Sequence, residues 1–189
     1  IKSLNLIESS KLKLLYDPII NIKDINNKIH KKIDQNNYFL SVGRLTKQKN
    51  FMFLCKAFKE LIKENKELKL IIAGEGEEET NLKRFIVKHT LEKNIILVGH
   101  VQNIYPYFKN SNGFILTSLW EDPGFVLIEA SYCRTVVLSS NSWPGPSELI
   151  KDEFNGIVFE NNDLESFLNK FKYLIKFKNT NNLKFNNLK

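Results

Sequence analysis

Two cations follow the first long apolar run of the chain, beside a glycine. Residues 38–43 are apolar and end at Gly43, and the next residues bring Arg44 and Lys49 to the start of an amphipathic stretch. Glycine lets a backbone turn sharply, and the first amides of a helix have no intrahelical acceptor. Two cations and free amides at one point favour an anion, above all a diphosphate. Lys47, in the same loop, is interpreted as a solvated residue of a lysine-rich chain.

A pair of glutamates marks a second region that could bind a ligand. Glu121 precedes an otherwise apolar stretch, and Glu129 lies within it. Asp122 and Pro123 predict the cap and the first residue of a helix that carries Glu129. A carboxylate in an apolar stretch needs partners, because an unpaired buried charge is costly, and the vicinal hydroxyls of a ribose would supply two. The alternative for Glu129, a surface glutamate on an amphipathic helix, is the commoner case.

The elements that must position these residues follow from apolar periodicity. Strands are predicted at residues 38–43, 68–73, 95–99, 113–117, 136–139 and 156–159. Helices are predicted around residues 51–62, 82–89, 105–109, 123–133 and 164–175, with Asn50 as a cap of the first and Asn162 or Asp163 as the start of the last. Apolar strands that alternate with amphipathic helices predict an α/β, Rossmann-like parallel sheet with helices on both faces. Ligands bind beyond the carboxyl ends of such strands, which is where Arg44 and Glu121 lie.

Composition and charge exclude several classes of protein. With 189 residues, 42% hydrophobic and 26% charged, the chain has the size and composition of one soluble globular domain. No signal peptide is expected, and no apolar run approaches the roughly 20 residues that a membrane-spanning helix needs. Cys55 and Cys133 lie far apart in apolar segments, which favours buried thiols in a reducing compartment.

The formal charge of +7 comes almost wholly from lysine. The lysines are scattered and no basic-aromatic motif accompanies them, so nucleic acid is not expected as a partner. Compositional bias explains the total charge. The functional interpretation is attraction to a nucleoside diphosphate or to an anionic membrane surface. We therefore expect a cytoplasmic protein, with peripheral contact at the cytoplasmic face of the membrane as a second expectation.

Taken together, these segments resemble the C-terminal, donor-binding domain of the retaining GT-B glycosyltransferases of glycosyltransferase family four (group 1). The resemblance runs from about residue 38 to residue 177. Its anchors, in order, are Gly43 to Lys49, Ala73 to Gly76, Val98 to Val101, the pair Glu121 and Glu129, and Pro146 to Glu148 with Asn155 and Gly156. Several matches in one order carry more weight than any single motif.

The resemblance implies a role for each site residue. Arg44 and Lys49 would hold the donor diphosphate and neutralise it as it leaves, and Glu121 would bind a hydroxyl of the transferred sugar, which makes these three the expected catalytic group. Glu129 would bind the donor ribose. The other donor-binding residues implied are Gly43, Val101, Pro123, Gly124, Phe125 and Val126. No cofactor and no metal are expected, since cations and a helix terminus take over the neutralisation of charge.

The same resemblance divides the chain into three parts. Residues 1–36 are expected to be an interdomain linker, or the end of a missing N-terminal domain, residues 37–178 the nucleotide-sugar-binding domain, and residues 179–189 a loose tail. The chain starts with Ile1, so a preceding segment is expected. The acceptor site would belong to that N-terminal domain, and the chain by itself is expected to bind donor without transferring sugar.

Departures from the family pattern narrow the expected substrate. Asp122 and Pro123 replace the usual glycine and phenylalanine, while Arg134 and Val136 replace a glycine and a proline. This variant is similar to bacterial surface-polysaccharide enzymes that handle N-acetylhexosamines or galactose, so a UDP-sugar is the expected donor and a saccharide or lipid-linked acceptor the expected partner.

Two other functions stay open at this point. A non-catalytic nucleotide-binding regulatory module would share the anion site, and an upstream α/β domain in the same reading frame would favour the enzyme. A dehydrogenase cofactor domain is less favoured, because the turn at residues 74–76 lacks the third glycine of a dinucleotide fingerprint and follows the second strand.

Overall fold

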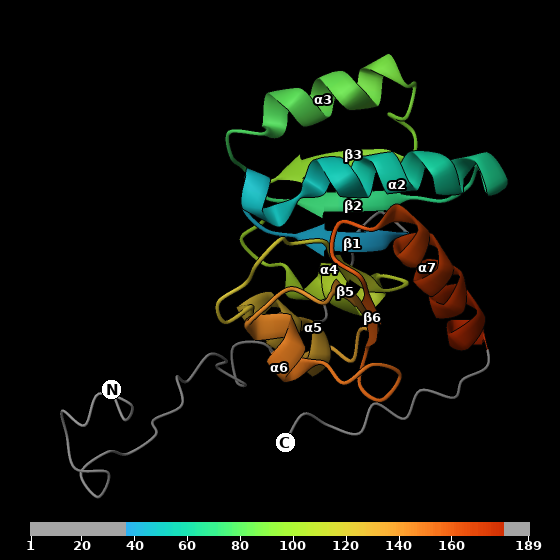
Figure 1. The fold of residues 1–189 in the computed structure, drawn as a ribbon. Coiled ribbons are helices and arrows are strands. Elements are labelled where there is room, and N and C mark those ends of the chain that lie inside the picture. The colour runs from blue at the N-terminus through green and yellow to red at the C-terminus, as the bar shows by residue number, and fades with distance from the viewer. Residues whose placement is uncertain (1–36, 180–189) are drawn as a thin grey trace, which may run out of the picture.

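One parallel sheet organises the domain. The computed structural model describes residues 37–179, and in them six strands pair in the order β3-β2-β1-β4-β5-β6 (Figure 1). The strands are β1 (Phe39–Val42), β2 (Leu70–Ala73), β3 (Ile95–Gly99), β4 (Phe114–Leu116), β5 (Val137–Ser140) and β6 (Ile157–Phe159). Every pairing is parallel, as the continuous apolar strands predict.

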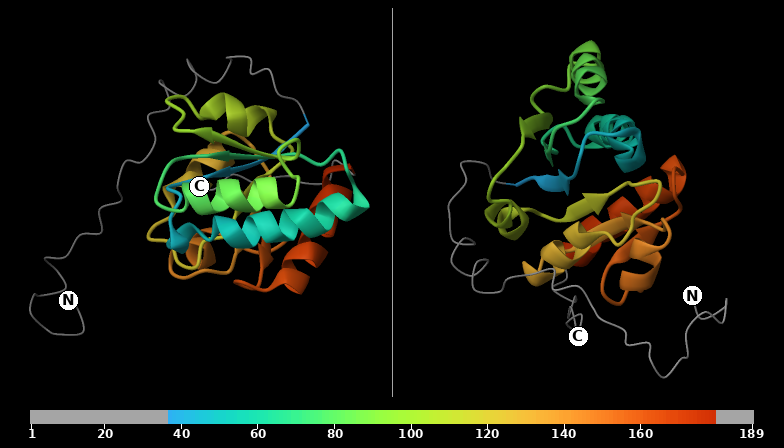
Figure 2. Two further views of the ribbon diagram at one scale, coloured as in Figure 1. Left: turned by 90° about the horizontal axis from the view of Figure 1, so that it is seen from above. Right: turned by 90° about the vertical axis from the view of Figure 1, so that its left-hand side faces the viewer.

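Helices connect the strands and cover both faces of the sheet. They are the short 3-10 helix η3 (Lys47–Lys49) and the α-helices α2 (Phe51–Glu64), α3 (Glu79–Lys88), α4 (Tyr105–Asn110), α5 (Phe125–Tyr132), α6 (Gly145–Leu149) and α7 (Leu164–Asn179). In the right-hand view of Figure 2, α2, α3 and α7 lie on one side of the sheet and α4 and α5 on the other. This confirms the predicted α/β, Rossmann-like fold.

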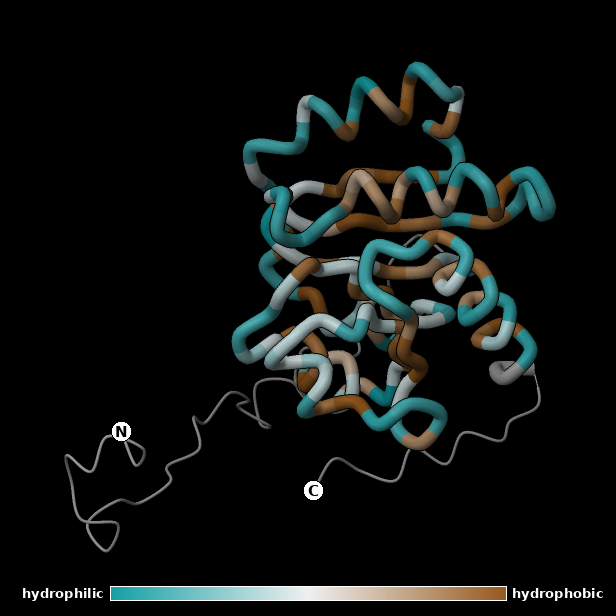
Figure 3. Tube along the Cα trace, viewed as in Figure 1, coloured by the Kyte–Doolittle hydropathy of each residue, from teal (hydrophilic) through white to brown (hydrophobic). Residues whose placement is uncertain are grey.

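Two apolar cores form because neighbouring residues of a strand point to opposite faces. Phe39 of β1 belongs to the core under α2, α3 and α7, whereas Leu40 belongs to the core under α4 and α5. In β2, Leu70 and Ile72 face the first core and Ile71 the second. Figure 3 shows the hydrophobic colour of these strands between more hydrophilic helices. Burial on both faces explains why the strand sequences are apolar throughout.

The strand order reverses between β1 and β4. From β1 the chain adds β2 and then β3 on one side, and then returns to place β4 against the other side of β1, where Leu40 aligns with Phe114. A crevice opens at the carboxyl ends of the strands at such a reversal, because the connections on its two sides run in opposite directions. The loops after β1 and β4 therefore meet there.

The helix ends differ in detail from the sequence predictions. Asn50 precedes α2 with a left-handed backbone (φ 54°) but makes no side-chain cap, so the predicted capping contact is wrong. At α7, Asp163 caps through its Oδ1, which accepts from the Ser166 amide at 3.0 Å. Helix α7 runs one residue past the predicted boundary at 178. The predicted linker at 1–36 and most of the predicted tail lie outside the described residues.

Candidate nucleotide-sugar site

Hydrogen bonds join the loops after β1 and β4 at the strand reversal. The Thr117 hydroxyl donates to the Lys49 carbonyl at 3.0 Å, and the Leu119 amide donates to the Gln48 carbonyl at 2.8 Å. In return, Gln48 Nε2 donates to the Trp120 carbonyl at 2.9 Å. These bonds fix the backbone of η3 against the segment that leads to Glu121. The backbone positions of Lys49 and Glu121 are therefore held relative to each other.

Close backbone packing sets the path of the loop after β1. The Gly43 amide donates to the Ala73 carbonyl at 3.0 Å, and the Leu45 amide donates to the Glu75 carbonyl at 2.8 Å. A Cβ at Gly74 would lie 1.9 Å from the Gly43 carbonyl oxygen, and Gly74 has φ 141°. Only glycine fits there. The glycines after β2 therefore form a tight packing turn, as predicted, and their spacing is explained without a dinucleotide.

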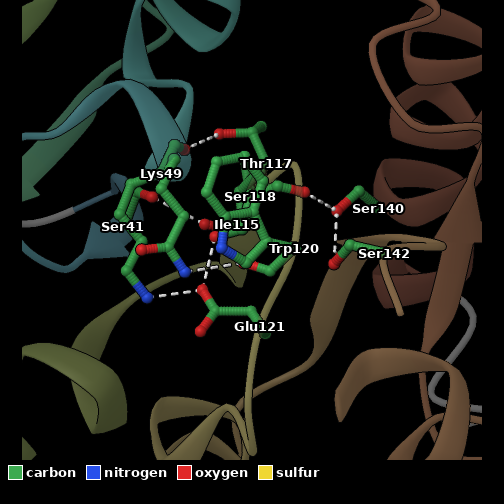
Figure 4. Close-up of polar contacts among 10 residues, drawn as sticks. Ser41, Lys49, Ile115, Thr117, Ser118, Trp120, Glu121, Ser140 and Ser142 are labelled. Atoms are coloured by element: carbon green, nitrogen blue, oxygen red, sulfur yellow. Dashed lines mark hydrogen bonds and ion pairs between the residues drawn. The ribbon is translucent and has the colours of Figure 1, made fainter. Parts of the chain in front are cut away.

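Lys49, Ser118 and Glu121 form a compact polar group at the centre of the reversal (Figure 4). Lys49 Nζ lies 2.5 Å from Glu121 Oε1, and the Ser118 hydroxyl donates to the same oxygen at 2.5 Å. Glu121 is only 4% exposed. A carboxylate this buried needs a counter-charge, and Lys49 supplies it. The structure thus brings together two of the three residues predicted to be catalytic.

A crevice of about 370 Å³ opens on the other side of Gly43. Its lining includes Val42, Gly43, Arg44, Glu75, His100 and Val101. Arg44 is exposed and forms no ion pair among residues 37–179, so its charge is available to an anion. A Cβ at Gly43 would lie 3.4 Å from Lys49 Cδ, which places the lysine chain against this glycine. The crevice and the Lys49–Glu121 pair are therefore neighbours.

The edge of the crevice is held by Glu75. Its Oε1 accepts from the His100 amide at 3.3 Å, which ties the turn after β2 to the loop after β3. Val101 follows directly and lines the crevice, so this predicted donor-binding residue lies where a ligand can reach it. His100 lines the same wall.

The start of α5 differs from the prediction. The helix begins at Phe125, and Gly124 is its N-cap with φ 81°, so Asp122 is not the cap and Pro123 is not the first helical residue. The Gly145 amide donates to the Glu121 carbonyl at 3.0 Å, and a Cβ at Gly145 would lie 2.5 Å from the Pro123 carbonyl oxygen. Packing against the start of α6 holds residues 121–123 outside the helix, so α5 begins only at Phe125.

Backbone amides are nevertheless present where the helix begins. Phe125 and Val126 occupy its first two positions, which have no intrahelical acceptor for their amides. Phe125 exposes 43% of its surface. Gly124 brings the chain back over Glu121, since a Cβ there would lie 3.6 Å from Glu121 Cβ. The donor contacts predicted for these residues are compatible with this geometry, and Pro123 is exposed beside them.

Glu129 lies in α5 and is not among the residues that line the crevice. It is half-buried in α5, and its carboxylate forms no hydrogen bond or ion pair with residues 37–179. Burial raises the pKa of its carboxyl above the ordinary value. Its charge adds to burial in raising the pKa of Cys133, one turn further on, to about 12. An unpartnered, half-buried carboxylate fits a residue awaiting hydroxyl donors, and the ribose contact stays a prediction.

Ser118, Thr117 and Gln48 were not found by sequence reasoning. Each is a polar residue at the carboxyl end of a strand or in the loop beyond it, where ligand sites form, and that position was the available signal. Residue type alone was too common to single them out. Across residues 37–179 there is no group of three or more potential metal ligands, and no helix with the length and apolar character needed to cross a bilayer.

A doubly wound sheet with a crevice beside its strand reversal, lined by charged residues, is typical of nucleotide-binding α/β domains. Within that class the chain belongs to the glycosyl transferases group 1 family, whose model matches residues 22–186.

Relatives of this chain are named as glycan-synthesising enzymes. It is 34% identical over 157 residues to the Escherichia coli UDP-Gal:alpha-D-GlcNAc-diphosphoundecaprenol alpha-1,3-galactosyltransferase, covering 82% of this chain and 40% of that protein. It is 31% identical over 171 residues to the N-acetylgalactosamine-N,N'-diacetylbacillosaminyl-diphospho-undecaprenol 4-alpha-N-acetylgalactosaminyltransferase of Campylobacter jejuni, covering 90% of this chain and 46% of that protein. The chain thus spans less than half the length of these two curated relatives.

Among solved structures, the pneumococcal O-GlcNAc transferase GtfA in complex with UDP and GlcNAc superposes with a TM-score of 0.66. The two sequences are 26% identical, and the match covers 78% of this chain and 30% of GtfA. The six-stranded fold described above is therefore that of one GT-B glycosyltransferase domain.

Proposed function

We propose that this chain is the donor-binding domain of a retaining glycosyltransferase of family four that uses a UDP-sugar. The observation that carries the proposal is the Lys49–Glu121 pair, which lies at the strand reversal beside a crevice of about 370 Å³. The base would occupy the crevice against Val101, and the ribose would extend from the crevice toward Glu129 of α5. The diphosphate would lie over Gly43, and the sugar would reach Glu121.

Each charged residue then has a distinct task. Arg44 and Lys49 neutralise the diphosphate as the bond to the anomeric carbon breaks, and the amides at the start of α5 add donors of fixed orientation. Glu121 accepts a hydrogen bond from a sugar hydroxyl and so orients the ring. Glu129 accepts from the ribose. Because fixed cations and amides balance the leaving charge, the site would work without a metal.

The relatives support a substrate class for the whole protein. Their names specify transfer of galactose or N-acetylgalactosamine to sugars on diphosphoundecaprenol. We propose a hexosyl or N-acetylhexosaminyl transferase of surface polysaccharide synthesis, with a saccharide or lipid-linked acceptor. The acceptor would be bound by an N-terminal domain that closes over the donor, in the cytoplasm or at the cytoplasmic face of the membrane.

Calorimetry with the 189-residue chain tests the donor site. UDP, UDP-galactose, UDP-N-acetylglucosamine and UDP-N-acetylgalactosamine are titrated in the presence of EDTA, with ADP as the control nucleotide. We expect binding of UDP and of at least one UDP-sugar without metal. Binding that requires magnesium or manganese would refute the metal-free proposal. The absence of binding by any uridine nucleotide under both conditions would refute the function itself.

A further inference from the structure

The two oxygens of the Glu121 carboxylate have different surroundings. Oε1 receives both the Lys49 ammonium and the Ser118 hydroxyl, each at 2.5 Å. Oε2 receives no hydrogen bond from residues 37–179, and Figure 4 shows it without a contact. A carboxylate has about four acceptor positions over its two oxygens. The acceptor capacity left for a ligand is therefore concentrated on Oε2.

Ser118 cannot itself meet a ligand, because its side chain is fully buried. Its backbone is fixed by β5, because the Ser140 hydroxyl donates to the Ser118 carbonyl at 2.7 Å. The hydroxyls of Ser140 and Ser142 lie 3.2 Å apart, and both residues are also buried (Figure 4). This buried serine cluster, Ser118, Ser140 and Ser142, anchors the end of β4 to the end of β5. Only Ser118 of the three contacts Glu121.

We propose that Ser118 is a positioning residue for sugar recognition, an inference that rests on the proposed function. Its hydroxyl saturates Oε1 together with Lys49 and holds the carboxylate so that Oε2 faces the sugar hydroxyl. Without Ser118 only Lys49 restrains Oε1, so the carboxylate can turn about its last bond and Oε2 loses part of its fixed direction. Ser118 thus acts through Glu121 on the sugar and not on the nucleotide.

Lys49 extends this effect to the diphosphate. An ammonium carries three donors, so Lys49 can keep its bond to Oε1 and still bind a phosphate oxygen. The same lysine then joins the group that recognises the sugar to the group that recognises the leaving diphosphate. Sugar and diphosphate are bound by one connected unit, and a shift of Glu121 changes the preference for the intact nucleotide sugar over UDP.

The test measures that preference as the ratio of Kd for UDP to Kd for the tightest-binding UDP-sugar of the panel. Ser118→Ala should lower the ratio roughly five- to tenfold, the effect of about one ordinary hydrogen bond, while Kd for UDP changes less than about twofold. Ser142→Ala is the matched control, because it removes a hydroxyl from the same buried cluster without touching Glu121, and should leave the ratio unchanged. If Ser118→Ala does not fold, Ser118→Cys keeps the size with a weaker donor and should lower the ratio in the same direction.

The Glu121→Ala background separates positioning from structure. Because Ser118 acts through Glu121, the double variant Ser118→Ala with Glu121→Ala should have the same ratio as Glu121→Ala alone. Three results would each overturn the positioning role while the wild-type chain still binds UDP-sugar. The ratio could be unaffected by Ser118→Ala, or the affinities for UDP and UDP-sugar could fall equally. Ser118→Ala could also lower the ratio in the Glu121→Ala background as much as it does in the wild type. If the wild-type chain binds no uridine nucleotide, the proposed function fails and this inference fails with it.

Discussion

Lys49 and Glu121 are 72 positions apart in the chain, yet the lysine ammonium lies 2.5 Å from the glutamate carboxylate. The contact forms because β1 and β4 are neighbours in the sheet and their loops meet beyond its edge. One side chain is 15% exposed and the other 5%, so water screens the pair only weakly.

Breaking this pair from one side should destabilise the free protein. Lys49→Met leaves the buried Glu121 carboxylate without a counter-charge, and we expect a loss of about 3 kcal/mol in the free energy of unfolding. Lys49→Met with Glu121→Gln should be more stable than Lys49→Met alone, since the uncompensated charge is gone. Urea unfolding of the two single variants, the double variant and wild type measures the coupling. Additive effects would mean that the pair does not form in solution.

Arg44 and Lys47 offer a matched comparison of two exposed cations in one loop. Only Arg44 lines the crevice. Arg44→Ala should weaken UDP binding by about 1.5–3 kcal/mol, roughly ten- to a hundredfold, because it removes a charged donor to the diphosphate. Lys47→Ala should change Kd less than about twofold. Calorimetry at fixed ionic strength checks both values, and an equal effect of the two variants would indicate general attraction by the basic chain.

Glu129 should lower the stability of the free protein at neutral pH while it contributes to UDP binding. Its pKa is raised by burial, so the native state holds the proton more tightly than the unfolded chain. Stability contributed by this group is therefore present at low pH and is lost as the pH rises from about 4.5, the ordinary value, through the native pKa. Glu129→Gln should be at least as stable as wild type at pH 7 and lose that advantage at pH 4, as urea unfolding at both values would show.

The same substitution should weaken UDP binding at pH 7, because an amide accepts more weakly than a carboxylate from the ribose hydroxyls. Glu129→Ala should cost about 1.5–3 kcal/mol of affinity. The exposed Glu92 supplies the control, since Glu92→Gln should leave Kd for UDP unchanged. Unchanged UDP affinity in both Glu129 variants would place this residue outside the nucleotide site.

Gly74 and Gly99 both have positive φ but differ in the space around them. A Cβ at Gly74 would lie 1.9 Å from the Gly43 carbonyl oxygen, whereas one at Gly99 would meet only a side-chain atom at 3.7 Å. Gly99→Ala should cost about 1–2 kcal/mol of stability from its left-handed backbone alone. Gly74→Ala should cost more than that and weaken UDP binding, because the clash displaces the loop that carries Arg44. Thermal unfolding and calorimetry on the two variants make the comparison, which fails if their effects are alike.

Local sequence determined the kind of fold and the edge at which the site lies. Apolar runs such as residues 68–73, separated by amphipathic helices, specify strands buried on both faces, and this requires a parallel sheet with helices on both sides. Loops that follow parallel strands all emerge at one edge, so Arg44, Lys49, Val101 and Glu121 could be assigned to that edge from their positions alone.

Tertiary structure decided which of these residues meet. Strand order depends on pairing between distant segments, and local periodicity carries no information on it, so the neighbourhood of β1 and β4 and the contact of Lys49 with Glu121 came only from the fold. The start of α5 was decided in the same way, because packing between Gly145 and Pro123 overrides the helix-start pattern of Asp122 and Pro123. Ser118 gains its role for the same reason: the hydroxyl of a serine becomes specific only where folding buries it against a single carboxylate oxygen.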